Sequence, residues 1–392
     1  MFSGESFIPK KPAEKSPEQD AEMFEPFDLK FYITDHSADS DNTGSPEKLR
    51  ELYTDIKKDG IDSVRYDWRW KNIEKNPGTY DQESLQRYAG AKNIMEEAGL
   101  KEPTIILSDI PDWAKKLYQE GEKEEFFAVF QEYAEQVAQS LMKCDGGKVS
   151  KIQILNELNN KIFTPVSIED LPKLCQIARA AFAEYNPDIK LTGTLLVSNL
   201  NYVSRMGMEI NQYLTEFEKI KGSFDTLAVD YYPGVWDYAI NRETLKSTKK
   251  LFRQMEPLKK VFQKLSEWGV DYELGEVGCP TMKFISNEKK QRYFYDTFFR
   301  AFRQMLVEMK KEGFNNMPSR VGFYSAIDEM LTGSIEETKD TIKAGPGFGM
   351  RDIEGERKEI LLGNRHVFEG EDRGPSQLSR IIKYMNTPVK KG

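Results

Sequence analysis

The sequence predicts a single-domain (β/α)8 barrel, or TIM barrel, and three observations lead to this fold class. Short runs of apolar and β-branched residues recur eight times along the chain. A stretch with helical periodicity follows each run. No segment rich in Pro, Gly or Ser divides the 392 residues into separate domains. Near-continuous apolar runs are typical of parallel strands buried on both faces, and eight strand–helix units close into a barrel.

The expected strands, in chain order, are residues 29–34, 62–67, 103–109, 151–157, 190–197, 225–232, 272–278 and 320–328. Between the third and fourth strands, apolar residues recur at i, i+4, i+7, i+11 and i+15, and this spacing predicts an amphipathic helix. That stripe consists of Phe126, Phe130, Tyr133, Val137 and Leu141. Similar patterns occupy residues 46–59, 81–98, 168–184, 204–221, 245–268, 288–312 and 375–386. A doubly wound open sheet is the alternative, but no glycine-rich fingerprint follows the first strand.

Two segments are expected to lie outside the regular barrel. Residues 1–26 are rich in Lys, Glu and Pro, which predicts a flexible lead-in to a barrel over 27–392. Residues 329–373 are longer than most βα loops, so we expect a long loop over one rim of the barrel.

The composition excludes several function classes. A net charge of −8 argues against nucleic-acid binding, which needs a basic face. No apolar run is long enough for a membrane span. Residues Cys144, Cys175 and Cys279 form neither a disulfide framework nor a zinc spacing, and His36 and His366 are the only histidines. We therefore expect no metal and no cofactor.

The amino-terminal residues lack the apolar stretch of a signal peptide. The sequence therefore leaves the compartment open: it is cytoplasmic for this chain as it stands, and secreted if a signal was removed ahead of residue 1.

Two glutamates carry the expected chemistry. Glu157 and Glu276 each close an apolar run, at the strand ends where such barrels hold their working residues. They are 119 positions apart, about three β/α units, and two carboxylates on one barrel face are the apparatus of retaining glycoside hydrolysis. Glu273 is the alternative to Glu276. Because the two differ by three positions, a regular strand would direct them to opposite faces.

The order of several motifs resembles clan A of the retaining glycoside hydrolases. That clan places an Asn-Glu after the fourth strand, a Glu after the seventh, an Arg on the second and a Tyr after the sixth. This sequence has Asn156-Glu157, Glu276, Arg65 and Tyr232 at those places. Segments 64–81, 111–114 and 347–358 also resemble clan sequences, and the resemblance spans roughly residues 28 to 385.

The resemblance implies a role for each of these five residues. Glu276 is the expected nucleophile, and Arg65 nearby would favour its ionised form. Tyr232 would donate a hydrogen bond to the same carboxylate. Glu157 is the expected acid and base, kept protonated by the negative charge of Glu276. Asn156 would contact the sugar 2-hydroxyl, and the two carboxyls should lie about 5–5.5 Å apart.

Five further residues are candidates for substrate binding. Trp70, Trp113 and Trp236 could stack on sugar rings, although each is equally a candidate for the core. His36, at the end of the first strand, could reach sugar hydroxyls or serve as a cap. Asp230 stands two residues before Tyr232, in the expected pocket.

Two positions depart from the clan pattern, and one tyrosine has a rival. Clan members usually carry a Trp near the end of the eighth strand, where this chain has Tyr324-Ser325. The sixth strand often has a His where this chain has Asp230. Tyr231 is the nearest alternative to Tyr232. Both departures fall in the pocket for the reacting sugar, so they bear on the substrate.

We expect a retaining β-glycosidase that acts on a β-linked oligosaccharide or polysaccharide through a glycosyl-enzyme. A carbohydrate is therefore the expected partner. The alternatives are a non-catalytic carbohydrate-binding barrel and a metal-dependent barrel enzyme. The sequence leaves open the sugar, the linkage, endo or exo action, hydrolysis or transglycosylation, and the oligomeric state.

Overall fold

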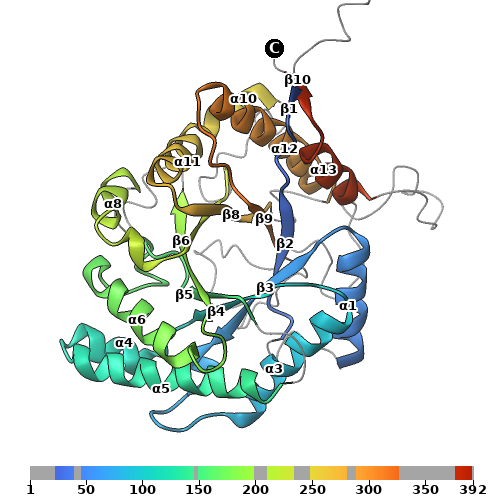
Figure 1. Cartoon of the computed structure of the whole chain (residues 1–392). Helices are drawn as coiled ribbons and strands as arrows, with labels where there is room; N and C mark the ends of the chain where they lie inside the picture. The colour runs from blue at the N-terminus through green and yellow to red at the C-terminus, as the bar shows by residue number, and fades with distance from the viewer. Residues whose placement is uncertain are drawn as a thin grey trace, which may run out of the picture.

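A computed structural model describes residues 23–38, 46–144, 149–197, 210–233, 248–279, 288–325 and 376–390. Within them, eight parallel strands close a barrel in sequence order, which confirms the predicted fold class (Figure 1). The barrel strands are β2 (Lys30–Asp35), β3 (Ser63–Arg69), β4 (Thr104–Ser108), β5 (Lys151–Ile154), β6 (Lys190–Val197), β7 (Thr226–Tyr231), β8 (Asp271–Val277) and β9 (Arg320–Tyr324).

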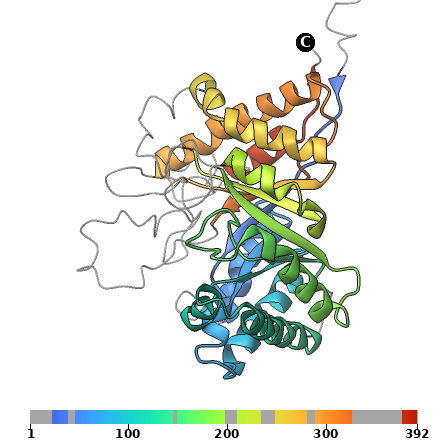
Figure 2. The same cartoon turned by 90° about the vertical axis from the view of Figure 1, so that its left-hand side faces the viewer.

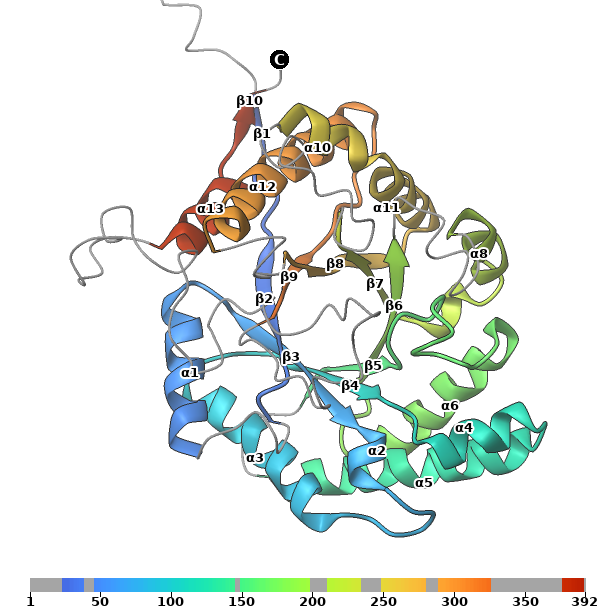
Figure 3. The same cartoon turned by 180° about the vertical axis from the view of Figure 1, so that it is seen from behind.

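Helices surround the strands, as the side view and the view from behind show (Figures 2 and 3). They are α1 (Pro46–Lys58), α2 (Trp70–Ile73), α3 (Gln82–Glu97), α4 (Asp112–Gln119), α5 (Lys123–Met142), α6 (Leu171–Phe182), α8 (Ile210–Phe217), α10 (Thr248–Gln254), α11 (Glu256–Trp268), α12 (Glu288–Lys311) and α13 (Gln377–Met385). Outside this ring, β1 (Met23–Phe24) pairs antiparallel with β10 (Val389–Lys390), which joins the two ends of the described chain.

The structure corrects the expected helices in one region and adds elements in others. The single helix expected over 245–268 is two helices, α10 and α11, which separate at Met255. Pro257 explains the break, because proline lacks an N–H and fits only the first turn of a helix. Helices α2 and α4 were not expected. The long loop over 329–373, Trp236 and His366 lie outside the described residues.

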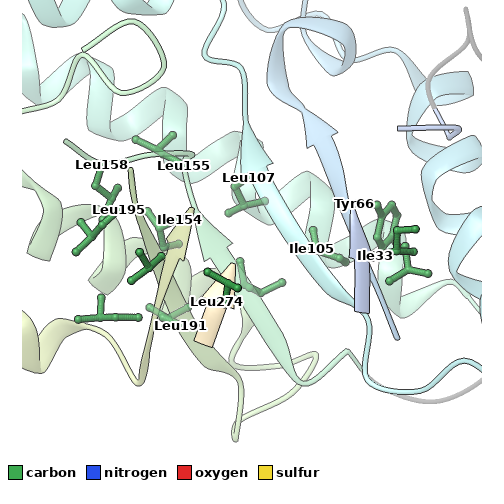
Figure 4. Close-up of a cluster of buried hydrophobic side chains, with 14 of the residues drawn as sticks. Ile33, Tyr66, Ile105, Leu107, Ile154, Leu155, Leu158, Leu191, Leu195 and Leu274 are labelled. Carbon is green, nitrogen blue, oxygen red and sulfur yellow. The ribbon is translucent and has the colours of Figure 1, made fainter. Parts of the chain in front are cut away.

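The outward faces of the strands build the hydrophobic core. Figure 4 shows part of it, and its labelled side chains come from β2, β3, β4, β5, β6 and β8 and from the loop after β5. The labelled residues are Ile33, Tyr66, Ile105, Leu107, Ile154, Leu155, Leu158, Leu191, Leu195 and Leu274, all of them buried. On β4, Ile105 and Leu107 are two positions apart, and on β6, Leu191 and Leu195 are four apart, as expected for residues that share one face of a strand.

The inward faces of the strands are largely polar. Lys151 on β5 pairs with Glu273 on β8 at 3.3 Å, although these strands are not neighbours in the barrel. Arg320 on β9 donates to Thr104 on β4 at 3.4 Å and lies 3.9 Å from Glu273. Such contacts must cross the barrel interior. Glu273 therefore contacts two buried cations, Lys151 and Arg320, inside the barrel. This cluster of charged side chains fills part of the interior that aliphatic side chains fill in many other barrels.

A β-bulge in β8 corrects the expectation that Glu273 and Glu276 point to opposite faces. The pairing of β7 with β8 shifts register after Val229, so that Asp230 stands opposite Glu276. A bulge adds one residue to a strand and re-aims the side chains that follow it. Glu273 and Glu276 consequently both face the barrel interior, at different depths.

In the described part of the chain, no helix is both long and apolar enough to span a membrane. Cys175 and Cys279 are buried, and Cys144 is partly buried.

Candidate active site

Four strands deliver the site to one end of the barrel. Arg65 comes from β3, Glu157 follows β5, Tyr232 follows β7 and Glu276 lies near the end of β8. Arg65 Nη1 donates to Glu276 Oε1, and the Tyr232 hydroxyl donates to Glu276 Oε2. Both contacts were predicted from the sequence. Each oxygen of the Glu276 carboxylate therefore accepts a hydrogen bond from a buried donor.

The guanidinium of Arg65 is held on every side. Its Nε donates to Gln153 Oε1 at 2.7 Å, and Nη1 also donates to Thr34 Oγ1 at 3.2 Å. Its Nη2 donates to Asn156 Oδ1 at 3.0 Å. A planar fork with several fixed acceptors cannot rotate, so its positive charge stays directed at Glu276.

The loop after β5 is bonded to β6 and holds Glu157 in place. The Glu157 N–H donates to Thr194 Oγ1 at 2.8 Å, and the Leu158 N–H donates to the Thr194 carbonyl at 2.8 Å. Glu157 has a left-handed backbone with φ of 45°. A residue other than glycine adopts this conformation at a cost and needs surrounding bonds to keep it, a feature common at functional sites.

The two carboxylates have different electrostatic surroundings. Burial, with a smaller contribution from the negative charge of Glu276, raises the pKa of Glu157 to about 8. A hydrogen bond from Asn160 and the charge of Arg65 act in the opposite direction. The sequence argument named the charge of Glu276 as the cause, but burial contributes more. Glu157 is therefore a neutral acid at pH 7, whereas Glu276 has a cation in direct contact.

Asp230 is a third carboxyl in the barrel interior. It is fully buried, and neither of its oxygens has a hydrogen-bond partner among the described residues. Its side chain lies against Gly275, where a Cβ would stand 2.3 Å from Asp230 Oδ1. Burial raises the pKa of Asp230 well above its usual range, and the charge of Glu276 adds to this. A carboxyl without donors in such a place is protonated.

Tyr231, the alternative to Tyr232, faces away from the site. Tyr231 donates its hydroxyl to the Gln254 carbonyl at 2.6 Å, and its ring lies 6.3 Å from that of Phe298. These partners belong to α10 and α12, so Tyr231 packs in the layer between strands and helices. Successive residues of a strand point to opposite faces, which leaves Tyr232 on the inner side.

The two described tryptophans of the candidate set belong to one aromatic cluster. Trp70 is fully buried, stacks on Tyr133 at 4.9 Å and donates its Nε1–H to Glu74 at 2.7 Å. These contacts place Trp70 in the core, which was the alternative to stacking on a sugar ring. Trp113 is partly buried, lies edge-on to Trp70 at 5.9 Å and donates to the Glu74 carbonyl at 3.3 Å.

Histidine and tyrosine rings line the side of the site near β2 and β9. His36 Nδ1 lies 2.8 Å from Asp67 Oδ2, so this histidine pairs with a carboxylate. The ring of Tyr324 lies 5.6 Å from the ring of His36 and 5.9 Å from that of Tyr232. Tyr324 thus places an aromatic ring beside Tyr232, near the point where the clan usually has a tryptophan.

Four residues of the site were not singled out from the sequence. Thr34, Gln153 and Thr194 are polar residues at inward positions of β2, β5 and β6, and the alternation along each strand could have identified them. Asn160 donates to Glu157 Oε2 at 2.6 Å. No pattern marked it, because it lies in an irregular turn. The described residues contain no group of three or more His, Cys, Asp or Glu placed to hold a metal ion.

No family model matches the chain, and no curated protein matches it significantly. Solved structures do share its fold. The β-glycosidase BGL167 is 15% identical, with a TM-score of 0.58 over 92% of this chain and 97% of that one. The GH5_18 protein from Streptomyces cattleya, solved with GlcNAc, is 13% identical, with a TM-score of 0.62 over 93% and 83%. The exo-β-1,4-mannosidase Op5Man5 from Opitutaceae bacterium strain TAV5 is 14% identical, with a TM-score of 0.57 over 93% and 61%.

Proposed function

We propose that this chain is a retaining β-glycosidase, which hydrolyses β-linked oligosaccharides or polysaccharides through a glycosyl-enzyme. The observation that carries the proposal is the difference between the two buried carboxylates. Glu276 accepts hydrogen bonds from Arg65 and Tyr232, whereas the pKa of Glu157 is raised to about 8. A pair of carboxyls with such different surroundings suits a nucleophile and a general acid.

In the first step, a Glu276 oxygen attacks the anomeric carbon while the bond to the leaving oxygen breaks. Glu157 gives its proton to that oxygen, and the glycosyl-enzyme forms. The charge of Glu276 is now consumed, so the pKa of Glu157 falls. In the second step, Glu157 takes a proton from water as the water attacks the anomeric carbon. The sugar leaves with its original configuration, and Glu276 is again a carboxylate.

Asn156 suits the role of a donor to the sugar 2-hydroxyl. Its Oδ1 accepts bonds from Arg65 at 3.0 Å, Gln153 at 3.2 Å and Thr194 at 3.3 Å. These contacts fix the orientation of the amide, so the NH2 group is the end that can donate to a ligand. A hydrogen bond to the 2-hydroxyl strengthens in the transition state.

The proposed substrate class extends no further than the β-linkage. The solved neighbours include a β-glycosidase and an exo-β-1,4-mannosidase. Within the described residues, Trp113, His36 and Asp230 are the candidates for sugar contacts. A panel of aryl β-glycosides with β-glucan, mannan, xylan and galactan polymers would identify the sugar.

Azide rescue tests the two roles. Glu276→Ala should abolish turnover of every substrate, and azide should restore activity with an α-configured glycosyl azide as product. Glu157→Ala should still form the glycosyl-enzyme from aryl glycosides with good leaving groups, and azide should give the β-configured product. The anomeric configuration is read by NMR.

Glu273→Gln is the matched control, because Glu273 lies on the same strand and makes no bond to the reacting atoms. Azide should not raise its activity. If the two azide products were exchanged, the two roles would be exchanged. Wild-type rates in both glutamate variants would contradict the proposed mechanism, and no turnover of any substrate by the wild type would favour a non-catalytic binding protein. Loss of activity after treatment with a chelator would favour the metal-dependent alternative.

A further inference from the structure

The side chain of Asn160 can only donate to Glu157. Asn160 is 2% exposed, and its Nδ2 donates to Glu157 Oε2 at 2.6 Å. Its Oδ1 accepts the Ile162 N–H at 3.1 Å, which fixes the amide with its NH2 group toward Glu157. A flipped amide would turn its NH2 group toward the Ile162 N–H, which would then have no acceptor.

The backbone of the same turn prevents Asn160 from moving away. The Asn160 N–H donates to the Glu157 carbonyl at 2.7 Å. Its own carbonyl accepts from the N–H groups of Phe163 at 3.1 Å and Thr164 at 2.8 Å. The donor and the carboxylate therefore belong to one hydrogen-bonded turn, and their geometry is set before any ligand arrives.

We propose that Asn160 is a positioning residue, which directs the proton of Glu157 to Oε1 and stabilises the carboxylate once that proton has left. The proposal rests on the acid and base role of Glu157 proposed above. Because Oε2 accepts the amide N–H, the acidic hydrogen belongs on Oε1. After proton transfer, a charge-assisted bond to Oε2 favours the anion that must activate water.

Other groups also act on the Glu157 proton, and they come from different strands. Glu276 on β8 opposes ionisation of Glu157, and Arg65 on β3 favours it. Asp230 on β7 also interacts electrostatically with Glu157 and is held neutral by burial. Among the residues that the structure describes, Asn160 is the group that donates a hydrogen bond to the Glu157 carboxyl. Its removal should therefore change the ionisation of Glu157 without touching the nucleophile.

The test compares Asn160→Ala and Asn160→Asp with Asn159→Ala. Asn159 is equally buried in the same turn, but it bonds the backbone of Leu196 through both ends of its amide, at 2.8 and 2.9 Å. Loss of the Asn159 side chain should lower the melting temperature, and it should leave the alkaline limb of the plot of kcat/KM against pH in place. In Asn160→Ala the alkaline limb should move up by on the order of one pH unit, because the anion loses its donor.

Asn160→Asp keeps an acceptor for the Ile162 N–H and places a second carboxyl beside Glu157, so the limb should move up further. With an activated aryl β-glycoside, both Asn160 variants should show a larger burst of released phenol and a slower steady state, since deglycosylation needs the Glu157 anion. If the alkaline limb of the kcat/KM profile stayed in place in both Asn160 variants, or moved equally in Asn159→Ala, the role of Asn160 would be overturned while the proposed function would stand. A wild-type protein without glycosidase activity would overturn the proposed function as well.

Discussion

At the scale of single residues, the site depends on how strictly Arg65 is oriented. Arg65 contacts Thr34, Gln153, Asn156 and Glu276 with one planar group. A buried guanidinium needs such a set of acceptors, because each unmet N–H would carry a desolvation cost. The same contacts direct positive charge at the nucleophile and fix the amide of Asn156. One side chain thus couples the nucleophile to the proposed sugar contact.

The first prediction follows for Arg65→Lys. Lysine keeps the charge but offers a compact ammonium, which cannot satisfy Gln153, Asn156 and Glu276 at once. We expect kcat/KM to fall on the order of 10²–10³-fold, the scale for losing an oriented donor at a charged site. Steady-state kinetics with an aryl β-glycoside measure this. A loss below about threefold would show that charge alone is sufficient.

At the scale of elements, β8 carries two carboxylates with different tasks. Glu273, deeper in the barrel, pairs with Lys151 at 3.3 Å and lies 3.9 Å from Arg320. Burial by itself would raise the pKa of Glu273, but these two cations lower it overall. Glu276 follows the bulge at the upper end of the same strand. One irregular strand therefore supplies both a buried ion-pair partner and the proposed nucleophile.

Glycines make this arrangement of β8 possible. A Cβ on Gly275 would collide with Asp230, and a Cβ on Gly322 would lie 2.0 Å from the Gly275 carbonyl oxygen. That carbonyl accepts the Tyr32 hydroxyl at 2.8 Å inside the barrel. Any side chain at Gly322 would push β8 and β9 apart.

The second prediction concerns Glu273→Leu, which removes the carboxylate but keeps much of the side-chain volume. Lys151 and Arg320 would lose their anionic partner in the interior, and breaking one side of a buried ion pair typically costs about 3–5 kcal/mol. Urea unfolding should show a loss of that order. A double variant that also carries Lys151→Met should recover part of it. Stability equal to the wild type would mean that water already screens these cations.

At the scale of the whole molecule, the barrel keeps two protonated carboxyls in its interior. Burial raises the pKa of Glu157 from 4.5 to about 8 and that of Asp230 well above its usual range. The folded protein retains these protons, whereas the unfolded chain releases them above its ordinary carboxyl pKa. Deprotonation therefore favours unfolding, and these groups stabilise the fold most below about pH 4.5.

The third prediction is a dependence of stability on pH. The contribution of Glu157 should decline as the pH rises from about 4.5 and be lost as the pH passes through about 8. Glu157→Gln and Asp230→Asn remove the titrating proton, so each should raise the melting temperature at pH 8 more than at pH 5. Thermal unfolding across this range measures the difference. Parallel wild-type and variant curves would contradict the assignment of neutral carboxyls.

Much of the fold and of the site could be predicted from the sequence, because those features depend on local patterns. Near-continuous apolar runs with helices between them specified eight parallel strands. A residue at the end of a parallel strand must lie at one end of the barrel, so Glu157, Glu276 and Tyr232 could be expected to meet, and the resemblance to the clan added Arg65 within its strand. Pro257 likewise marks the break between α10 and α11 in the sequence, although the apolar stripe across this position predicted a single helix.

Tertiary structure alone decided the features that depend on partners far away in the chain. The bulge in β8 arises from pairing with β7, and it turned both Glu273 and Glu276 inward. The burial of Trp70 follows from its packing on Tyr133 of α5. The raised pKa of Glu157 results mainly from the surface that surrounding strands and loops exclude from water. The sequence alone determined which residues stand at the ends of the strands, since strand ends are local features. Packing determined their orientation and protonation, because burial and cross-barrel contacts exist only after the barrel has closed.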